Sequence, residues 1–198
     1  MSWNAAACLG AMVAAVACRA AVPAARPATA ACSAPEGRLP PSPAVAQLAG
    51  EYRLRLVATA GRKSGAAVDA RLGLRPRVDS LQAPPVPETR DTATRYPLAG
   101  WLDLDPAAIG ATPTGDLRSV DGSAPGVLVI ERHPPAPDSP ASIVLRLGAE
   151  ANRRGVLRFD GGYFALTVRR IGPEGFAGTW SSGSGGETAA GYFCAERS

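Results

Sequence analysis

Apolar and polar residues alternate along much of the chain after residue 48. Tyr52, Leu54 and Leu56 are separated by arginines, and residues 66–75 repeat the same two-residue period. Successive side chains of a β-strand point to opposite faces, so this period is typical of strands that bury one face and expose the other. The pattern therefore predicts β-structure from about residue 48 to the C-terminus.

The alternation divides this region into about nine strands. They are expected at residues 52–56, 66–75, 96–104, 126–132, 142–148, 155–160, 163–170, 176–182 and 189–196. Gly-rich segments at residues 61–65 and 160–162 predict tight hairpin turns. No window after the N-terminal region has the period of an amphipathic helix, so the crossovers of a parallel sheet are missing. We predict an all-β fold, an antiparallel up-and-down meander of eight to ten strands that closes or nearly closes into a barrel. A β-sandwich is the alternative, because it gives the same alternation.

An Ala-Gly step followed within two positions by an aromatic or large apolar residue recurs along the chain. It occurs in residues 48–52, 98–102, 176–180 and 190–193. Glycine recurs inside strands where a sheet bends sharply or an aromatic ring packs over bare backbone, which favours a strongly coiled barrel. Such a barrel, with the step Gly178-Thr179-Trp180, resembles the calycin-type barrels, the lipocalins and avidins. The lipocalin Gly-x-Trp lies on the first strand, where this chain has Gly50-Glu51-Tyr52. The resemblance is architectural, covers residues 48–196 and carries over no ligand residue.

The inward face of a small barrel is either filled by side chains or lines a lumen for one small ligand. That face is apolar here, so a lumen would favour an apolar ligand. The candidate ligand-binding residues are Tyr52, Leu54, Leu56, Ala70, Leu72, Leu145, Phe164, Leu166 and Trp180. The alternative is a core that the same side chains fill completely.

Alternate loops of a meander lie at the same end. With nine strands, the loops at residues 76–95, 133–141 and 183–188 share one rim, and the loop at residues 105–125 lies at the other. Loops of this length are often functional or mobile.

The N-terminal region predicts export. Residues 5–22 are apolar and rich in small side chains, which is typical of a signal-peptide core and too short for a membrane span. Ala15-Val16-Ala17-Cys18 resembles a lipobox, which would make Cys18 a lipid-modified N-terminus; ordinary cleavage after residue 17 or residue 30 is the alternative. We therefore expect a signal peptide at residues 1–18, an Ala/Pro-rich tether at 19–47 and one barrel domain at 48–198. The expected location is extracytoplasmic: periplasm, cell envelope or secreted, with a possible lipid anchor.

Two cysteines remain in the folded part after processing, one near each end of it. In an oxidising compartment, Cys32 and Cys194 predict one disulfide; the alternative is two unpaired buried thiols.

The formal net charge is +4, and every basic residue except Lys63 is an arginine. The arginines are scattered and often interleaved with acidic residues, and no basic run contains aromatic residues. We therefore expect no nucleic-acid partner, and contact with a membrane only through a lipid anchor.

The sequence offers little catalytic chemistry. His133 is the single histidine, and no nucleophile motif accompanies it. Asp103, Asp105, Asp116 and Asp121 gather around one loop and could in principle hold Ca²⁺, but Asp in turns commonly bonds its own backbone. We assign no catalytic residue, metal or cofactor. The leading expectation is a binding module for a small apolar molecule or a partner surface, and the alternative is a structural or interaction protein of the cell envelope with a filled core.

Overall fold

The computed structural model describes residues 32–37, 39–40, 43, 45–77, 93–112, 115–121, 125–133, 141–148 and 162–198. The chain separates into residues 1–31 and a compact unit that begins at Cys32 and ends at Ser198. The expected signal peptide and Cys18 lie outside the described residues.

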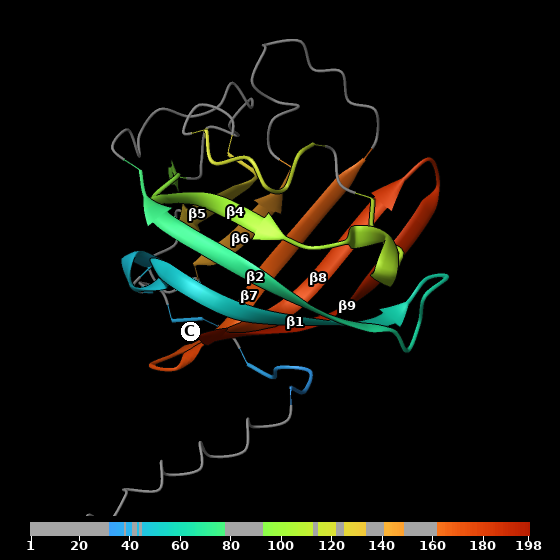
Figure 1. Cartoon of the computed structure of the whole chain (residues 1–198). Helices are drawn as coiled ribbons and strands as arrows, with labels where there is room; N and C mark the ends of the chain where they lie inside the picture. Colours follow the sequence, from blue (N-terminus) through green and yellow to red (C-terminus); the bar gives the residue numbers. More distant parts are fainter. Residues whose placement is uncertain are drawn as a thin grey trace, which may run out of the picture. The chain divides into compact units, whose positions relative to one another are not determined.

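The described part contains strands and two short 3₁₀ helices (Figure 1). The strands are β1 (Gly50–Ala60), β2 (Ala67–Pro76), β3 (Ala93–Arg95), β4 (Leu98–Asp103), β5 (Val127–His133), β6 (Ser142–Leu147), β7 (Tyr163–Gly172), β8 (Gly175–Ser184) and β9 (Glu187–Arg197). The 3₁₀ helices are η1 (Val45–Leu48) and η2 (Pro106–Ile109). The expected strand at residues 155–160 and the expected turn at 160–162 lie outside the described residues, apart from Gly162.

The strands form a closed antiparallel meander. Each strand of the ring pairs with its neighbour, β1 pairs with β9, and β5 pairs with β6 to complete the circle. Eight of the described strands make this ring, and β3 pairs with the last residues of β5 beside β4. Figure 1 shows β1, β2 and β4 on the near side of the ring. The all-β prediction and the closed barrel are confirmed, and the sandwich alternative is wrong because the first and last strands are hydrogen-bonded to each other.

The barrel has two ends, which we name after their 3₁₀ helices. At the η1 end, β1, β4, β6 and β8 begin, and β2, β5, β7 and β9 finish. The loops at residues 76–95 and 133–141 leave this end, as expected. The expectation that the 183–188 turn shares it is wrong, because that turn lies beside the β1–β2 hairpin at the η2 end, where Arg62 pairs with Glu187. The reason is that β6 pairs directly with β7 in the ring, so every later loop changes ends relative to the nine-strand count.

The η1 end is covered by residues that precede the first strand. Leu39, Val45 and Leu48 are buried and belong to the same apolar cluster as the barrel interior. The Tyr52 hydroxyl donates to the Leu48 carbonyl oxygen at 3.1 Å. The Arg197 guanidinium donates to the backbone carbonyls preceding β1 and lies 5.2 Å from the centre of the Tyr52 ring. Part of the segment expected as a tether is thus packed onto the barrel.

The η2 end is covered by the segment that follows β4. Ile109 has no exposed surface, and Leu117 is also buried in the main cluster. The Ser182 hydroxyl on β8 accepts a hydrogen bond from the Thr112 amide at 2.9 Å and donates to the Thr112 carbonyl at 3.3 Å. These bonds fix the segment over the barrel opening and satisfy the buried hydroxyl.

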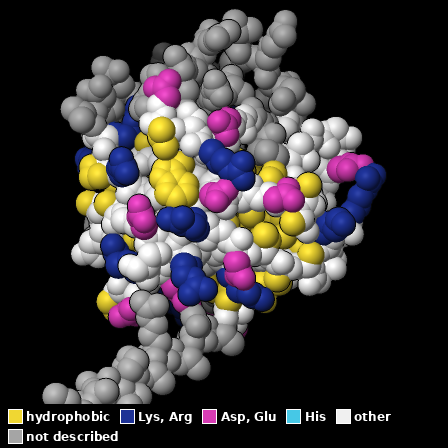
Figure 2. Space-filling model, viewed as in Figure 1, with side chains coloured by type: hydrophobic (Ala, Val, Ile, Leu, Met, Phe, Trp, Pro, Cys, Tyr) yellow, Lys and Arg dark blue, Asp and Glu magenta, His cyan; other side chains and the backbone are white. Residues whose placement is uncertain are grey.

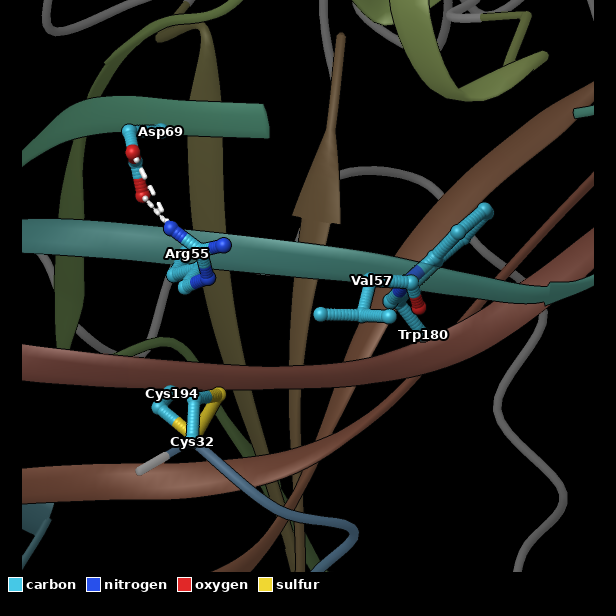
Figure 3. The surroundings of a disulfide bond; sticks show 6 residues. All are labelled: Cys32, Arg55, Val57, Asp69, Trp180 and Cys194. Carbon is cyan, nitrogen blue, oxygen red and sulfur yellow. Dashed lines mark hydrogen bonds and ion pairs between the residues drawn. A yellow bond between two sulfur atoms is a disulfide. The ribbon is translucent and has the colours of Figure 1, made fainter. Parts of the chain in front are cut away.

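Close approach of an aromatic ring to bare backbone occurs at Gly191 of β9. The Trp180 indole on β8 reaches past this glycine and donates from Nε1 to the Val57 carbonyl oxygen on β1 at 3.0 Å (Figure 3). A Cβ at Gly191 would lie 1.8 Å from that oxygen. Glycine is required here because the tryptophan spans an intervening strand, which agrees with the glycine–aromatic use expected from the sequence.

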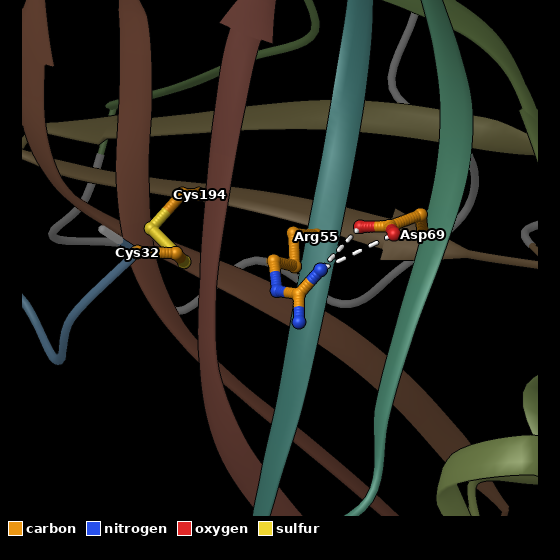
Figure 4. Close-up of polar contacts among 4 residues, drawn as sticks. All are labelled: Cys32, Arg55, Asp69 and Cys194. Carbon is orange, nitrogen blue, oxygen red and sulfur yellow. Dashed lines mark hydrogen bonds and ion pairs between the residues drawn. A yellow bond between two sulfur atoms is a disulfide. The ribbon is translucent and has the colours of Figure 1, made fainter. Parts of the chain in front are cut away.

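The predicted disulfide is confirmed. Cys32 is bonded to Cys194 of β9, with a Cα–Cα separation of 5.7 Å. In the strand register Cys194 is the neighbour of Arg55, and Arg55 is the neighbour of Asp69, with which it forms an ion pair at 3.1 Å. The bridge and the ion pair therefore lie in one row on the outside of the barrel (Figure 4).

Candidate functional site

The nine predicted ligand-binding side chains all lie in the barrel interior. Tyr52, Leu54, Leu56, Ala70, Leu72, Leu145, Phe164, Leu166 and Trp180 are buried members of one apolar cluster. Their gathering in one interior follows from the alternation that predicted them. Their role in binding a ligand stays a prediction.

These side chains leave little room beside them. Eight of the nine are at most 2% exposed, and Ala70 is 8% exposed. A void that could hold one water molecule would leave accessible surface on the side chains around it. Ring packing fills much of the volume, since Phe164 lies edge-on to Trp180 with their centroids 5.9 Å apart. The lumen side chains in the described residues are therefore almost fully buried.

The chemically distinctive group of the interior face is on β5. Val127, Val129, Glu131 and His133 alternate with outward residues, so they share the inward side of the strand. Glu131 is 8% exposed and is the one charged residue that is buried among the described residues. The alternation of apolar residues did not single out Glu131, although its spacing of two residues from His133 is a signal that could have identified it.

Glu131 and His133 contact each other directly. His133 Nε2 lies 2.8 Å from Glu131 Oε1. The histidine side chain is 29% exposed and the glutamate side chain 11%, so the imidazole is reachable from the η1 end while the carboxylate lies below it. An ionised carboxylate can only accept hydrogen bonds, so this contact favours the tautomer with a proton on Nε2.

The neighbours of Glu131 come from both adjacent strands. Ile143 on β6 faces it across the β5–β6 ladder, and Arg95 on β3 faces it across the other. Paired residues of antiparallel strands share a face, with Cβ atoms about 4.5–5.5 Å apart. Arg95 itself is exposed.

Three of the loop aspartates bond to a backbone amide or to an arginine. Asp105 accepts from the Ala107 amide at the start of η2, Asp116 accepts from the Arg118 amide, and Asp103 forms an ion pair with Arg118. Asp105 and Asp116 thus make the side-chain to backbone hydrogen bonds that are common in turns. In the described residues, no group of three or more His, Cys, Asp and Glu side chains is placed to hold a metal ion.

The outer surface mixes the two signs of charge. Figure 2 shows Lys or Arg and Asp or Glu side chains interspersed over the face that contains β1 and β2. Farther round the ring, Arg146 is half-buried on β6. Burial lowers the pKa of this guanidinium, with an opposing contribution from Tyr96 and a further lowering from Arg132.

Comparisons with known proteins give no relative. Protein-family models, curated proteins and solved structures were compared with this chain, and none of them matches it. Neither of the short helices in the described residues is long and apolar enough to span a membrane.

Proposed function

We propose that this protein is a structural or interaction module of the cell envelope, which uses a filled β-barrel as a scaffold and acts through its surface. The observation that carries the proposal is the near-zero exposure of the lumen side chains. A ligand-carrying barrel keeps a space for its ligand, whereas the lumen side chains here have almost no accessible surface. The leading expectation from the sequence, a lumen for a small apolar molecule, is therefore less well supported than its alternative.

The coverage of both ends supports the same conclusion. Val45 and Leu48 close the η1 end, and Ile109 closes the η2 end. An apolar ligand would have to displace packed segments whose hydrogen bonds include those of Tyr52 and Ser182. The fold therefore offers its ends and outer face, rather than an open lumen, to a partner.

Export is part of the proposal. A disulfide such as Cys32–Cys194 persists in oxidising compartments and is rare in the cytosol. Together with the apolar N-terminal residues and the lipobox-like residues before Cys18, it supports a secreted or lipid-anchored protein. One acyl-modified N-terminus would place the barrel near a membrane surface without inserting it.

The kinship with calycin-type barrels is also a proposal. It is supported by the closed eight-stranded meander, whereas the first strand departs from the lipocalin Gly-x-Trp because Tyr52 stands in the place of the tryptophan. A lipocalin-like ancestor with a filled interior would explain a barrel of this type without a ligand space.

Native mass spectrometry of the exported protein, purified without delipidation, tests the filled core. We expect the mass of the chain plus any covalent lipid, with no component released by organic extraction. A reproducible non-covalent adduct that disappears on extraction would contradict the proposal and identify a lumen ligand.

A matched variant makes a negative result informative. Leu145→Ala should open a cavity beside Leu166, its neighbour in the β6–β7 register, because truncation of a buried leucine leaves space that the surroundings fill only partly. We expect a small apolar probe such as benzene to bind this variant and not the parent protein. Equal binding to both would show that the parent already has a space.

A further inference from the structure

We propose that the outer side of β7, β8 and β9 is a docking surface for a neutral saccharide chain. The inference rests on the proposed function, because it names the chemistry of a partner for the barrel surface. The docking surface consists of the outward residues within 163–167, 179–183 and 188–192, which adjoin one another in the strand register. We call it the uncharged face.

The uncharged face spans three strands without a charged side chain. Thr167, Thr179 and Tyr192 are paired in one row across the strands, and Tyr163 is paired with Gly183 in another. The alternate residues of these strands are buried in the barrel interior, so the paired residues point outward. No residue of the three ranges is acidic or basic. The face therefore presents hydroxyl, methyl and phenol groups.

Outward positions elsewhere on the barrel are charged. On β1 and β2, Arg53, Arg55, Asp69 and Arg71 are exposed outward residues, and Figure 2 shows the mixed charges of that side. Depletion of charged residues together with tyrosine distinguishes the core of an interface from the rest of a protein surface. The composition of the uncharged face thus indicates a surface that meets a partner.

Tyr163 supplies an aromatic ring whose position is fixed before a partner arrives. A Cβ at Gly183 would lie 2.8 Å from Cε1 and 3.3 Å from Cζ of Tyr163, so the ring lies against the bare backbone of that glycine. The ring is nevertheless 41% exposed, and it is one of two large hydrophobic side chains that are exposed in the described residues. A ring supported by the sheet offers its solvent side at little cost in side-chain entropy.

Hydroxyl groups lie on a diagonal line from Tyr163 to Tyr192. Ser181 is two residues from Gly183, the partner of Tyr163, and its own partner Ala190 is two residues from Tyr192. Diagonal neighbours are about 7–8 Å apart, so the two tyrosines are separated by about 15 Å with the serine between them. In the described part of the chain, the hydroxyls of Tyr163, Ser181 and Tyr192 have no protein hydrogen-bond partner. They are therefore available as donors and acceptors.

The chemistry of these groups selects a neutral saccharide. The C–H groups of a sugar ring carry a partial positive charge, which meets the negative face of an aromatic ring. Sugar hydroxyls both donate and accept hydrogen bonds, as do the hydroxyls of serine, threonine and tyrosine. A charged ligand would lose hydration on this face without gaining an opposite charge.

A second copy of the chain fits the uncharged face less well. Three strands about 4.8 Å apart and three outward rows about 6.8 Å apart give an area of roughly 300 Å². A stable protein–protein interface buries about 800 Å² on each partner. The face belongs to a closed ring and is convex, so two copies would touch over even less. A saccharide chain is narrow enough to lie along the diagonal line of hydroxyls.

Titration of the ¹⁵N-labelled exported protein tests the proposal. The probes are the neutral sugars cellohexaose, maltohexaose and the hexamer of N-acetylglucosamine, with hexagalacturonate as the charged control. We expect at least one neutral hexamer to cause saturable amide shifts confined to residues 163–167, 179–183 and 188–192, and hexagalacturonate to cause none. Absence of saturable shifts with every neutral hexamer, or equal shifts with hexagalacturonate, would overturn the proposal. Shifts of the same amides that grow with protein concentration alone would also overturn it, because a second copy would then occupy the face.

Aromatic variants identify the stacking ring. Tyr163→Ala should weaken binding about fivefold or more, whereas Tyr163→Phe keeps the ring and should stay within about twofold of the parent. Trp101→Ala is the matched control and should leave the affinity unchanged. Trp101 also lies against a glycine, since a Cβ at Gly73 would be 2.5 Å from its Nε1, but it lies beside Arg71 among charged residues. Equal weakening by Tyr163→Ala and Trp101→Ala would refute the site.

A charge variant tests the neutrality of the partner. Ser181→Glu places a carboxylate between the two tyrosines and should abolish the shifts, and unchanged affinity would contradict the proposal. The saccharide is added from outside, whereas the lumen is monitored by mass. Failure here therefore leaves the filled-core proposal standing, and a lumen adduct would leave this result intact.

Discussion

Removal of the Cys32–Cys194 bridge should destabilise the barrel by several kilocalories per mole. The bridge joins residues 162 positions apart, and the chain-entropy model for a loop of that length gives about 5 kcal/mol at 25 °C. The change is Cys32→Ser combined with Cys194→Ser. Both thiols lie outside the ring, so the substitution leaves the lumen packing intact and acts chiefly on the unfolded chain.

Urea unfolding, followed by tryptophan fluorescence to which the buried Trp180 contributes, measures the loss of stability. With a slope of about 2 kcal/mol per molar urea for a domain of this size, the midpoint should fall by about 2–3 M. Dithiothreitol should lower the midpoint of the parent protein to that of the double variant and leave the variant unchanged. A loss below about 1 kcal/mol would refute the reasoning, because it would mean that the bridge hardly restricts the unfolded chain.

Two further changes test the closure of the barrel. Tyr52→Phe removes the hydrogen bond to the Leu48 carbonyl and should cost about 0.5–1.5 kcal/mol at neutral pH. Burial raises the pKa of the Tyr52 phenol above 10.0, so its contribution to stability is complete below pH 10.0 and is lost as the pH rises further. The difference in unfolding free energy between the parent and the variant, measured by urea unfolding, should therefore narrow above pH 10.0. A difference that widens there would contradict this reasoning. Gly191→Ala brings a Cβ within 1.8 Å of the Val57 oxygen. It should lower the free energy of unfolding by about 1–3 kcal/mol or more, and the melting temperature should fall with it. Gly172→Ala, whose Cβ would have its nearest backbone oxygen at 4.0 Å, is the control and should change the melting temperature little.

The sequence predicted the parts of the fold that depend on alternation. On β1 the inward residues Tyr52, Leu54 and Leu56 are fully buried and the arginines between them are exposed, because the closed ring has one dry and one wet face. The disulfide followed from the position of two cysteines relative to the export segment. Closure of the ring did not follow from alternation, since it depends on β1 meeting β9, a pairing of the two ends of the domain.

Other features depended on information that periodicity does not contain. Leu39 and Val45 stand among prolines without a period, so their burial under the barrel is a tertiary effect. The predicted end of the barrel for the 183–188 turn was wrong because the prediction placed one more strand in the ring, between β6 and β7, which pair directly. Short turns give no internal sign of the end to which they belong.

The inward position of Glu131 could not be predicted because the strand that carries it is apolar on both sides. β5 is buried on both sides, with Val127 and Val129 in the main core and Leu128 and Ile130 in a second cluster outside the ring. A continuous apolar run carries no alternation, and the run therefore does not reveal to which side the following glutamate belongs. Glu131 lies two residues after Val129, so it shares a face with Val127 and Val129, but only the structure shows that this face is the lumen.

The lumen residues and Glu131 differ in how their burial affects stability. Lumen residues such as Phe164 are held by packing on all sides, so almost any change there costs stability and gains no new contact with solvent. Glu131 is the opposite case, because burial of a carboxylate costs desolvation free energy that an apolar residue at the same position would not incur. The buried apolar lumen thus has the side-chain environment that stability favours, and Glu131 at the η1 end of β5 is the one buried charged residue of the described part that departs from it.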